Sequence, residues 1–472
     1  MNFKTIFKSL KNKEMLKRIL IVFGLLIVYR FIAHIPVPLG EPATFQEAIQ
    51  NLLQKSDFGN FLNLVSGGGF ANFSILLIGI SPYITASIVV QLVTKAIPRL
   101  EELSQDGETG RRKISQWTRI LAVPLAIVQS IAYTFILYQS TLSANTAIAY
   151  TPTTADWILS ITSMVAGSMI LMWFGELITE QGIGNGISTI IIASIIAQLP
   201  STLAGLGAGL FDTSAGSLSL FGWFNLPVNP LYFWLILGFA VALLVVIYFL
   251  VKLNEAQRVI TVNYAKRVHG NSTYGGIKSI LPLKLIAAGV VPVIFATAFL
   301  SLPALIGQLI QTINPGNIFG ATLVNLFTAA SADNFSALYP NGITAQWFLY
   351  PALYFILVVL FTYFYTSIIF NTNEIADNLQ KQGGFIEGIR PGNQTAEYLG
   401  KTINRLNLFG ALALGVIAML PFLTDYIFIL LAGQPIGLSI SGTGLLIIVT
   451  VALENLRQIN SRALMVTYDE YK

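Results

Sequence analysis

The residues that could do chemistry in this 472-residue chain are few, because most of its length is apolar. Its apolar stretches hold almost no ionisable side chains: Arg30 and His34 lie in the first, and Asp156 and Glu454 lie near the ends of two others. Carriers coupled to protons or sodium keep buried Asp, Glu or His, and intramembrane metalloproteases need an HExxH motif. Paired Asp, or Ser with His, is also missing from these stretches. The sequence therefore predicts a protein that is not an enzyme.

Cofactor and metal chemistry find equally little support in the sequence. The chain has no cysteine, and its two histidines, His34 and His269, are too few ligands for most metal sites. It has neither a P-loop nor a GxGxxG motif. We therefore expect no cofactor and no metal. The apolar residues can still act without a chemical reaction. Aliphatic side chains around a constriction form a gate that closes by excluding water.

Ten apolar stretches must position these side chains. The chain is 54% hydrophobic and only 10% charged, whereas a soluble protein carries about 25% charged residues. A bilayer core of about 30 Å needs roughly 20 apolar residues per helix. We predict an all-α polytopic membrane protein with ten transmembrane helices, the first of them retained and not cleaved as a signal peptide. The predicted spans are 18–38, 73–97, 117–139, 154–174, 184–200, 230–251, 283–303, 345–369, 404–424 and 440–456.

The basic residues orient these spans. Of the 27 Lys and Arg residues, all except Arg30 and Lys55 fall in the segments 1–18, 95–119, 252–284, 381–405 and 457–472. With ten spans these segments share one side of the membrane, and an excess of Lys and Arg marks the cytoplasmic side. Both termini are therefore predicted to be cytoplasmic.

An internal repeat divides the chain. GISPYITAS at 79–87 aligns with GVVPVIFAT at 289–297, at an offset of 210. These segments fall on spans two and seven, which cross in opposite directions, as an inverted repeat of two five-helix halves requires. We predict halves at 1–200 and 230–472, joined by an external connection at 201–229. A proline inside a helix produces a kink, so Pro82 and Pro292 are predicted to kink their helices; at symmetry-related positions they indicate a shared interface.

Three segments fit no span. Residues 57–72, which contain three consecutive glycines, are either a re-entrant piece from the outer side or an ordinary outer loop. The polar cytoplasmic loops 252–282 and 371–402 are long enough to dock a large partner. Their basic residues would equally serve only to orient the chain.

Five motifs carry a resemblance to a known family. They are GISPYITASIVVQL, GELITEQGIGNGIS, EAQRVITVNYAKR, YGGIKSILPLKLIAAGVVPVIFA, and NEIADNLQKQGGFIEGIRPG with TAEYL, and they occur in the expected order. Over residues 16–465 the chain resembles the SecY/Sec61-alpha family of protein-translocase channel subunits. The resemblance implies a channel that passes unfolded secretory polypeptides across the membrane and releases hydrophobic segments sideways into lipid. A secondary transporter of a small solute is the alternative.

The resemblance also implies four groups of site residues. An aliphatic pore ring would consist of Ile80, Ile84, Ile187, Ile191, Ile294 and Ile447. A plug within 57–72 would include Phe61, Leu62, Leu64, Val65, Gly67, Gly68, Gly69 and Phe70. A lateral gate between spans two and seven would include Pro82, Ser87, Ile88, Gln91, Pro292 and Thr297. The partner-docking residues would be Arg258, Lys266, Arg267 and Arg390.

The resemblance further implies partners and a location. The expected partners are the SecE and SecG subunits, the SecA motor ATPase, the ribosome, signal sequences with their secretory polypeptides, and membrane lipid. Direct DNA binding is not expected. The expected location is the bacterial inner (cytoplasmic) membrane.

Overall fold

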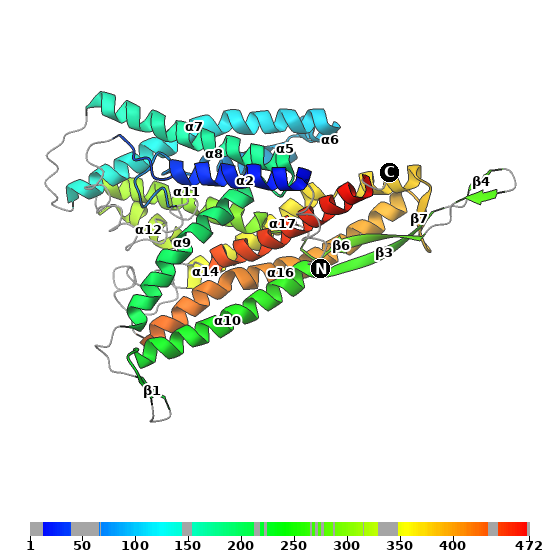
Figure 1. Ribbon diagram of the computed structural model, residues 1–472. Helices are drawn as coiled ribbons and strands as arrows, with labels where there is room; N and C mark the ends of the chain where they lie inside the picture. The colour runs from blue at the N-terminus through cyan, green and yellow to red at the C-terminus, as the bar shows by residue number, and fades with distance from the viewer. Residues whose placement is uncertain are drawn as a thin grey trace. The chain divides into compact units, whose positions relative to one another are not determined.

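Each of the ten predicted spans overlaps a helix in the computed structural model (Figure 1). The structure describes residues 13–38, 66, 68–143, 153–211, 218–220, 224–264, 267–269, 272–274, 278–286, 288–314, 316–328, 348–432 and 442–469. Among these residues, six helical segments are long and apolar enough to cross a membrane by length and composition alone. The spanning helices are α2 (Lys13–Ile32), α5 (Ser81–Ala96), α7 (Gly107–Ser143), α8 (Thr154–Gln181), α9 (Gly186–Leu210), α10 (Pro230–Glu255), α11 (Val291–Ile313), α14 (Leu349–Ile369), α16 (Asn393–Ala432) and α17 (Gly442–Asp469).

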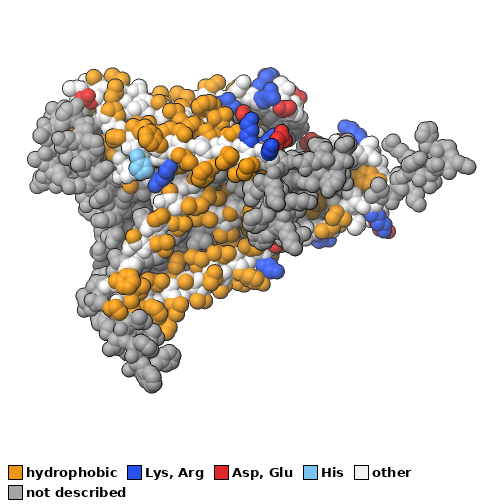
Figure 2. Space-filling view, in the orientation of Figure 1, with side chains coloured by type: hydrophobic (Ala, Val, Ile, Leu, Met, Phe, Trp, Pro, Cys, Tyr) orange, Lys and Arg blue, Asp and Glu red, His pale blue; other side chains and the backbone are white. Residues whose placement is uncertain are grey.

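The outer faces of these helices are apolar, as lipid requires. In α2, Leu20, Phe23 and Phe31 are 59%, 60% and 73% exposed. In α10, Trp234 and Leu244 are 58% and 65% exposed. Hydrophobic side chains follow both helices along the face seen in Figure 2. Such continuous apolar surface would be unfavourable in water but suits a hydrocarbon solvent.

The chain forms two compact units. The first comprises Met1–Val241, Thr297–Ala352 and Pro421–Lys472, and the second comprises Ala242–Ala296 and Leu353–Leu420. The predicted halves, 1–200 and 230–472, stay a prediction.

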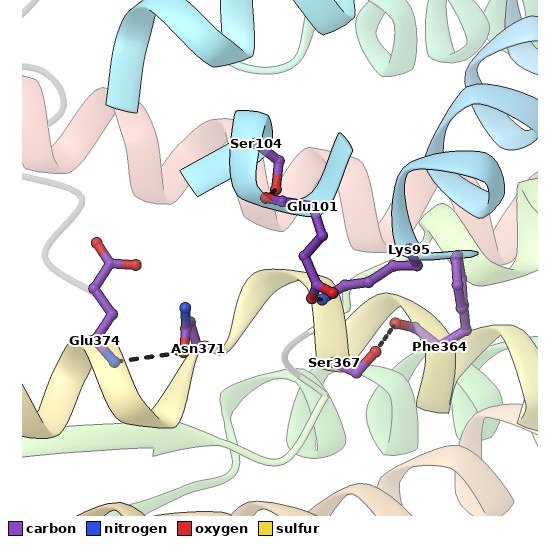
Figure 3. A network of polar contacts seen from close by, with 7 residues as sticks. All are labelled: Lys95, Glu101, Ser104, Phe364, Ser367, Asn371 and Glu374. Carbon is purple, nitrogen blue, oxygen red and sulfur yellow. Dashed lines mark hydrogen bonds and ion pairs between the residues drawn. The ribbon is translucent and has the colours of Figure 1, made fainter. Parts of the chain in front are cut away.

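In the first unit, helices pack closely where glycine allows it. Helix α5 packs on α7, α7 on α8, and α8 on α9. A Cβ added at Gly167 of α8 would meet the backbone carbonyl of Ile75, so only glycine fits where α8 meets the turn before α5. The ends of α7 and α8 are also joined by an ion pair of 2.7 Å between Arg119 and Glu176. A short helix, α6 (Pro98–Gln105), follows α5, and Lys95 reaches Glu101 across this corner at 2.7 Å (Figure 3).

The second unit contains a small sheet that the sequence analysis did not predict. Strands β3 (Gln257–Tyr264), β6 (Lys278–Lys284) and β7 (Gly384–Ile386) form an antiparallel sheet in the order β6-β3-β7. Alternate residues Ile260 and Val262 point inward and are buried against Leu399 and Ile403 of α16. The alternation gives the sheet one buried face, which is typical of a strand packed on a helix. The two long loops are therefore one folded platform, which also includes α15 (Thr372–Lys381), whose N-terminus is capped by Asn371 (Figure 3).

Three short elements complete the described structure. Helix α12 (Ile318–Phe327) packs on the second half of α11, where Gly307 and Gly320 allow close approach. Two hairpins, β1 (Leu218–Leu220) with β2 (Phe224–Leu226) and β4 (Arg267–His269) with β5 (Ser272–Tyr274), lie outside the spans.

The two copies of the predicted repeat share their local geometry. Gly79 and Gly289 are both left-handed, with φ of 61° and 62°, and each lies two residues before its helix begins. The backbone N–H of Ile84 donates to the carbonyl of Ile80, and that of Ile294 donates to the carbonyl of Val290. Burial also repeats, since residues 84–90 and 294–300 pass through the same order of buried, half-buried and exposed positions. Sequence similarity therefore corresponds to structural similarity here.

The prediction that Pro82 and Pro292 kink their helices is wrong. Each is the second residue of its helix, α5 or α11. In the first turn the proline nitrogen has no intrahelical acceptor to lose, and its fixed φ suits a helix start. The residues before it, 75–80 and 288–290, form turns and not helix. The prolines therefore fix where the two helices begin.

The left-handed glycines provide a test of this repeat. Replacing Gly79 or Gly289 by alanine should lower stability by about 1–2 kcal/mol each, because an L side chain is strained at positive φ. Thermal unfolding in detergent would measure the change. Gly24→Ala in α2 is the matched control: a Cβ there meets no atom within 4 Å, so it should stabilise slightly. Equal melting of all three variants would contradict the shared geometry.

Candidate functional site

The start of α5 places two of the predicted pore-ring residues on one face. Ile80 is the N-cap residue, and Ile84 lies one turn later, joined to it by the backbone hydrogen bond. Their side chains are 0% and 5% exposed. The turn that precedes them buries Leu76, Leu77 and Ile78 as well. The beginning of α5 is therefore surrounded by protein.

The start of α9 places a second aliphatic pair. Asn185 caps the helix, because its side-chain oxygen accepts from the backbone N–H groups of Ile187 at 3.0 Å and Ser188 at 3.4 Å. Ile187 and Ile191 follow four residues apart and so share one helix face. Ile191 is 1% exposed, whereas Ile187 is half-buried and its Cγ1 lies 3.2 Å from where a Cβ of Gly175 would be. The cap and this glycine fix how α9 begins beside α8.

The last two predicted ring residues lie on α11 and α17. Ile294, in the second unit, is 8% exposed, and Ile447, in the first, is 5% exposed. Helix α17 packs against α9, where the side-chain N–H of Asn455 donates to the Thr189 hydroxyl at 3.3 Å. Within the first unit the structure thus joins the elements that carry Ile187, Ile191 and Ile447. The ring as a whole stays a prediction.

Two of the predicted lateral-gate residues of α5, Ser87 and Gln91, form a polar contact on an otherwise apolar helix. Gln91 donates through its side-chain nitrogen to the Ser87 hydroxyl at 2.9 Å, one turn away. Ile88 between them is 5% exposed, and Pro82 is buried at the helix start. On α11, Pro292 is buried and Thr297 is half-buried. The gate itself stays a prediction.

The predicted plug lies mostly outside the described residues. Phe61, Leu62, Leu64, Val65 and Gly67 are not among them. The described remainder consists of Gly68, Gly69 and Phe70, all buried. Phe70 packs into the hydrophobic core of the first unit.

The described members of the predicted docking set lie in or beside the strands of the second unit. Arg258 is exposed near the start of β3, paired in register with Leu283. Strand β7 pairs with the opposite end of β3, and Arg390 follows it in the turn 388–392. Arg267 begins β4 just beyond that end, and Lys266 lies outside the described residues. Gly384 pairs with Tyr264 and Ile386 with Val262, so the chain leaves β7 in the direction of the start of β3.

The turn around Arg390 is rigid. Gly388 and Gly392 are left-handed, with φ of 81° and 95°. The Thr395 hydroxyl donates to the Arg390 carbonyl at 2.9 Å. The Arg390 side chain is exposed. A fixed backbone with an exposed guanidinium suits recognition of an anionic surface.

Sequence reasoning missed several polar groups within the spans. Gln129 of α7 is 3% exposed, and its side-chain oxygen has no hydrogen-bond partner among the described residues. An amide inside an apolar stretch was the available signal for it. The Asn185 cap was equally readable, because asparagine before an apolar run is typical of a helix start.

Known proteins share both the sequence and the fold. The SecY family model matches residues 74–456. The protein translocase subunit SecY of Streptomyces griseus is 36% identical over 477 residues, which cover 99% of this chain and 99% of that protein. The subunit of the same name from Corynebacterium glutamicum is 37% identical over 472 residues, with 98% of each chain covered.

Solved structures agree with this assignment. A protein-conducting channel matches with a TM-score of 0.60 at 18% identity, over 93% of this chain and 90% of that one. Canine Sec61 in a ribosome-channel complex matches with a TM-score of 0.57 at 18% identity, over the same shares of the chains. The fold is that of a polytopic, helical, protein-conducting channel. Together with the family match, this means that the chain belongs to the SecY family of protein-translocase channel subunits.

The α9 cap gives a test at this site. Asn185→Ala should lower stability by about 1 kcal/mol, because two backbone N–H groups at the helix start lose their acceptor. Asn185→Asp keeps an acceptor, so its stability should differ from that of the wild type by only a fraction of this amount. Thermal unfolding of the purified protein compares the three. An alanine variant as stable as the aspartate variant would contradict the capping role.

Proposed function

We propose that this chain forms a channel with an aliphatic waist, which passes unfolded secretory polypeptides and opens sideways to lipid. Four of the six predicted ring residues are at most 5% exposed: Ile80, Ile84, Ile191 and Ile447. The observation that carries the proposal is that apolar, buried side chains stand at the starts of α5 and α9, where a transporter would need polar ligands. The residues act by excluding water, and no covalent step is involved.

A waist of isoleucine side chains can exclude ions and still admit a polypeptide, and both properties follow from its apolar surface. An ion would lose its hydration shell there and gain no polar contact in exchange, so its entry is strongly unfavourable. An extended polypeptide exchanges water for aliphatic contact at each position, whichever residue passes. The seal therefore depends on a close fit and not on recognition of a sequence.

The sideways exit sorts polypeptides by hydrophobicity. Each Leu, Ile, Phe or Val at the centre of a helix contributes about −0.3 to −0.6 kcal/mol to entering lipid, and a central Asp, Lys or Arg costs about 2.5–3.5 kcal/mol. An exit between α5 and α11 would let a passing segment partition between the channel interior and the lipid. Signal sequences would leave by this route, and polar segments would continue across.

Energy for transport must come from partners, since the sequence has no P-loop for a nucleotide. The exposed Arg390 turn and the β4 hairpin would dock the SecA motor ATPase or the ribosome. SecE and SecG complete the assembly. The chain would lie in the bacterial inner membrane with both termini in the cytoplasm, as the distribution of Lys and Arg supports. In this role it is a channel and not an enzyme.

Single-channel recording in planar bilayers tests the proposal. The wild type should be silent, and a variant lacking residues 60–70 should conduct ions, because the deletion removes most of the predicted plug. Silence of both variants, even with a secretory precursor and its motor supplied, would contradict the sealed channel. Substrate-dependent flux of a small solute through the wild type would instead indicate a carrier.

Docking can be tested by charge reversal at Arg390. Arg390→Glu should reduce motor-driven transport by roughly tenfold or more, because a charge in a protein interface is replaced by its opposite. Lys401→Glu, at an exposed position of α16 that is not among the predicted docking residues, is the control and should have a smaller effect. Transport of a model precursor into vesicles measures both. Equal rates for the two variants would contradict docking centred on Arg390.

A further inference from the structure

One buried tyrosine joins three distant parts of the first unit. Tyr29 of α2 is 1% exposed. Its hydroxyl lies 2.6 Å from the Ser194 hydroxyl of α9 and donates to the backbone carbonyl of Ser66 at 3.3 Å. Ser66 and Ser194 are both 0% exposed. A polar contact this far from water is held strongly, because no solvent competes for its partners.

The protons of these hydroxyls allow a relay. Each hydroxyl has one proton to donate and two lone pairs that accept. The Ser194 hydroxyl also contacts the Ile190 carbonyl one turn earlier at 2.8 Å, so its one proton serves either that carbonyl or the Tyr29 oxygen. When Ser194 donates to the Tyr29 oxygen, Tyr29 donates to the Ser66 carbonyl. In this arrangement the tyrosine oxygen both accepts and donates, so its two hydrogen bonds hold the chain at Ser66 at a fixed position relative to α9.

The relay stands on the face of α9 that carries two predicted ring residues. Ile187, Ile191 and Ser194 are spaced at i, i+4 and i+7, so they form one stripe along the helix. Ser194 lies about 10 Å further along α9 than Ile187. With the predicted orientation, the relay is on the outer side of the waist.

Ser66 in turn organises the chain that leads into α5. Its hydroxyl accepts from the backbone N–H of Phe70 at 2.9 Å, and its carbonyl also accepts from the N–H of Gly69 at 3.3 Å. Beyond it, the N–H of Val37 donates to the Phe73 carbonyl at 2.8 Å, and the N–H of Ile75 donates to the Ile35 carbonyl at 2.9 Å. From Phe73 onward the segment is therefore held by backbone pairing, whereas at Ser66 it is held by the Tyr29 hydroxyl.

We propose that Tyr29 is a positioning residue of the channel. Its hydroxyl fixes the chain at Ser66 relative to α9, and thereby sets where the turns before α5 begin in relation to the predicted ring. The inference deepens the proposed function and rests on it. Loss of the hydroxyl should loosen the turns at Gly68–Ser74 and weaken the seal, while the hydrophobic packing of the ring remains.

The test compares Tyr29→Phe with Tyr354→Phe, which removes a tyrosine hydroxyl that is equally buried, at 0% exposure, in α14 of the other unit. Hydrogen exchange of the purified protein should show the amides of Gly69–Ser74 opening roughly five- to tenfold faster in Tyr29→Phe alone, as expected for loss of one buried hydrogen bond. Ser194→Ala should give the same pattern more weakly, because Tyr29 keeps its carbonyl acceptor. In planar bilayers, Tyr29→Phe should raise the resting ion conductance above that of the wild type and of Tyr354→Phe.

Two results would overturn the inference. One is unchanged exchange at Gly69–Ser74 in Tyr29→Phe. The other is a lower melting temperature with a proportional loss of transport but unchanged conductance, which is the behaviour of a merely structural residue. The 60–70 deletion, recorded in the same bilayers, separates this failure from failure of the channel itself. If that deletion is silent, the proposed function fails, whereas the exchange measurement still decides whether Tyr29 holds Ser66.

Discussion

The structure depends on one constraint: a backbone polar group inside a bilayer has no water to bond, so it must be paired within the protein. Helices satisfy this by themselves. The turns at 75–80 and 288–290 do not, yet the predicted spans place both within the membrane. They are possible because protein surrounds them, as the exposures of 0% for Leu76, 0% for Ile80 and 1% for Val290 demonstrate. Non-helical backbone within the membrane thus requires protein packed closely around it.

This constraint also explains where a channel can open. A helix start surrounded by protein offers N–H groups and small residues in a region that lipid cannot enter. Glycine at positive φ makes the sharp turn, proline sets the first helical turn, and isoleucine follows one turn later. The same pattern of glycine, proline and isoleucine occurs at the starts of α5 and α11. An aliphatic residue at such a position is held by the backbone geometry of its own helix and needs no charged partner.

The sheet of the second unit follows a different pattern, with one buried face and one exposed face. Strand β3 alternates buried Ile260 and Val262 with exposed neighbours, and α16 covers only the inner face. The rigid Arg390 turn is attached to this platform through β7. The predicted docking residues Arg258 and Arg390 are therefore carried by strands or turns and not by a spanning helix.

The sequence by itself determined the class of protein and the positions of the ten spans, and it predicted their orientation and the repeat, because apolar length, charge distribution and local motifs are one-dimensional properties. It misplaced Pro82 and Pro292, since an apolar run from 73 to 97 does not reveal that its helix begins only at Ser81. It missed the strands, whose alternation was hidden among polar residues, and it missed Tyr29, whose partners are 37 and 165 residues away. Those features were decided only by tertiary structure, because hydrogen bonds in a buried space depend on which distant segments meet there.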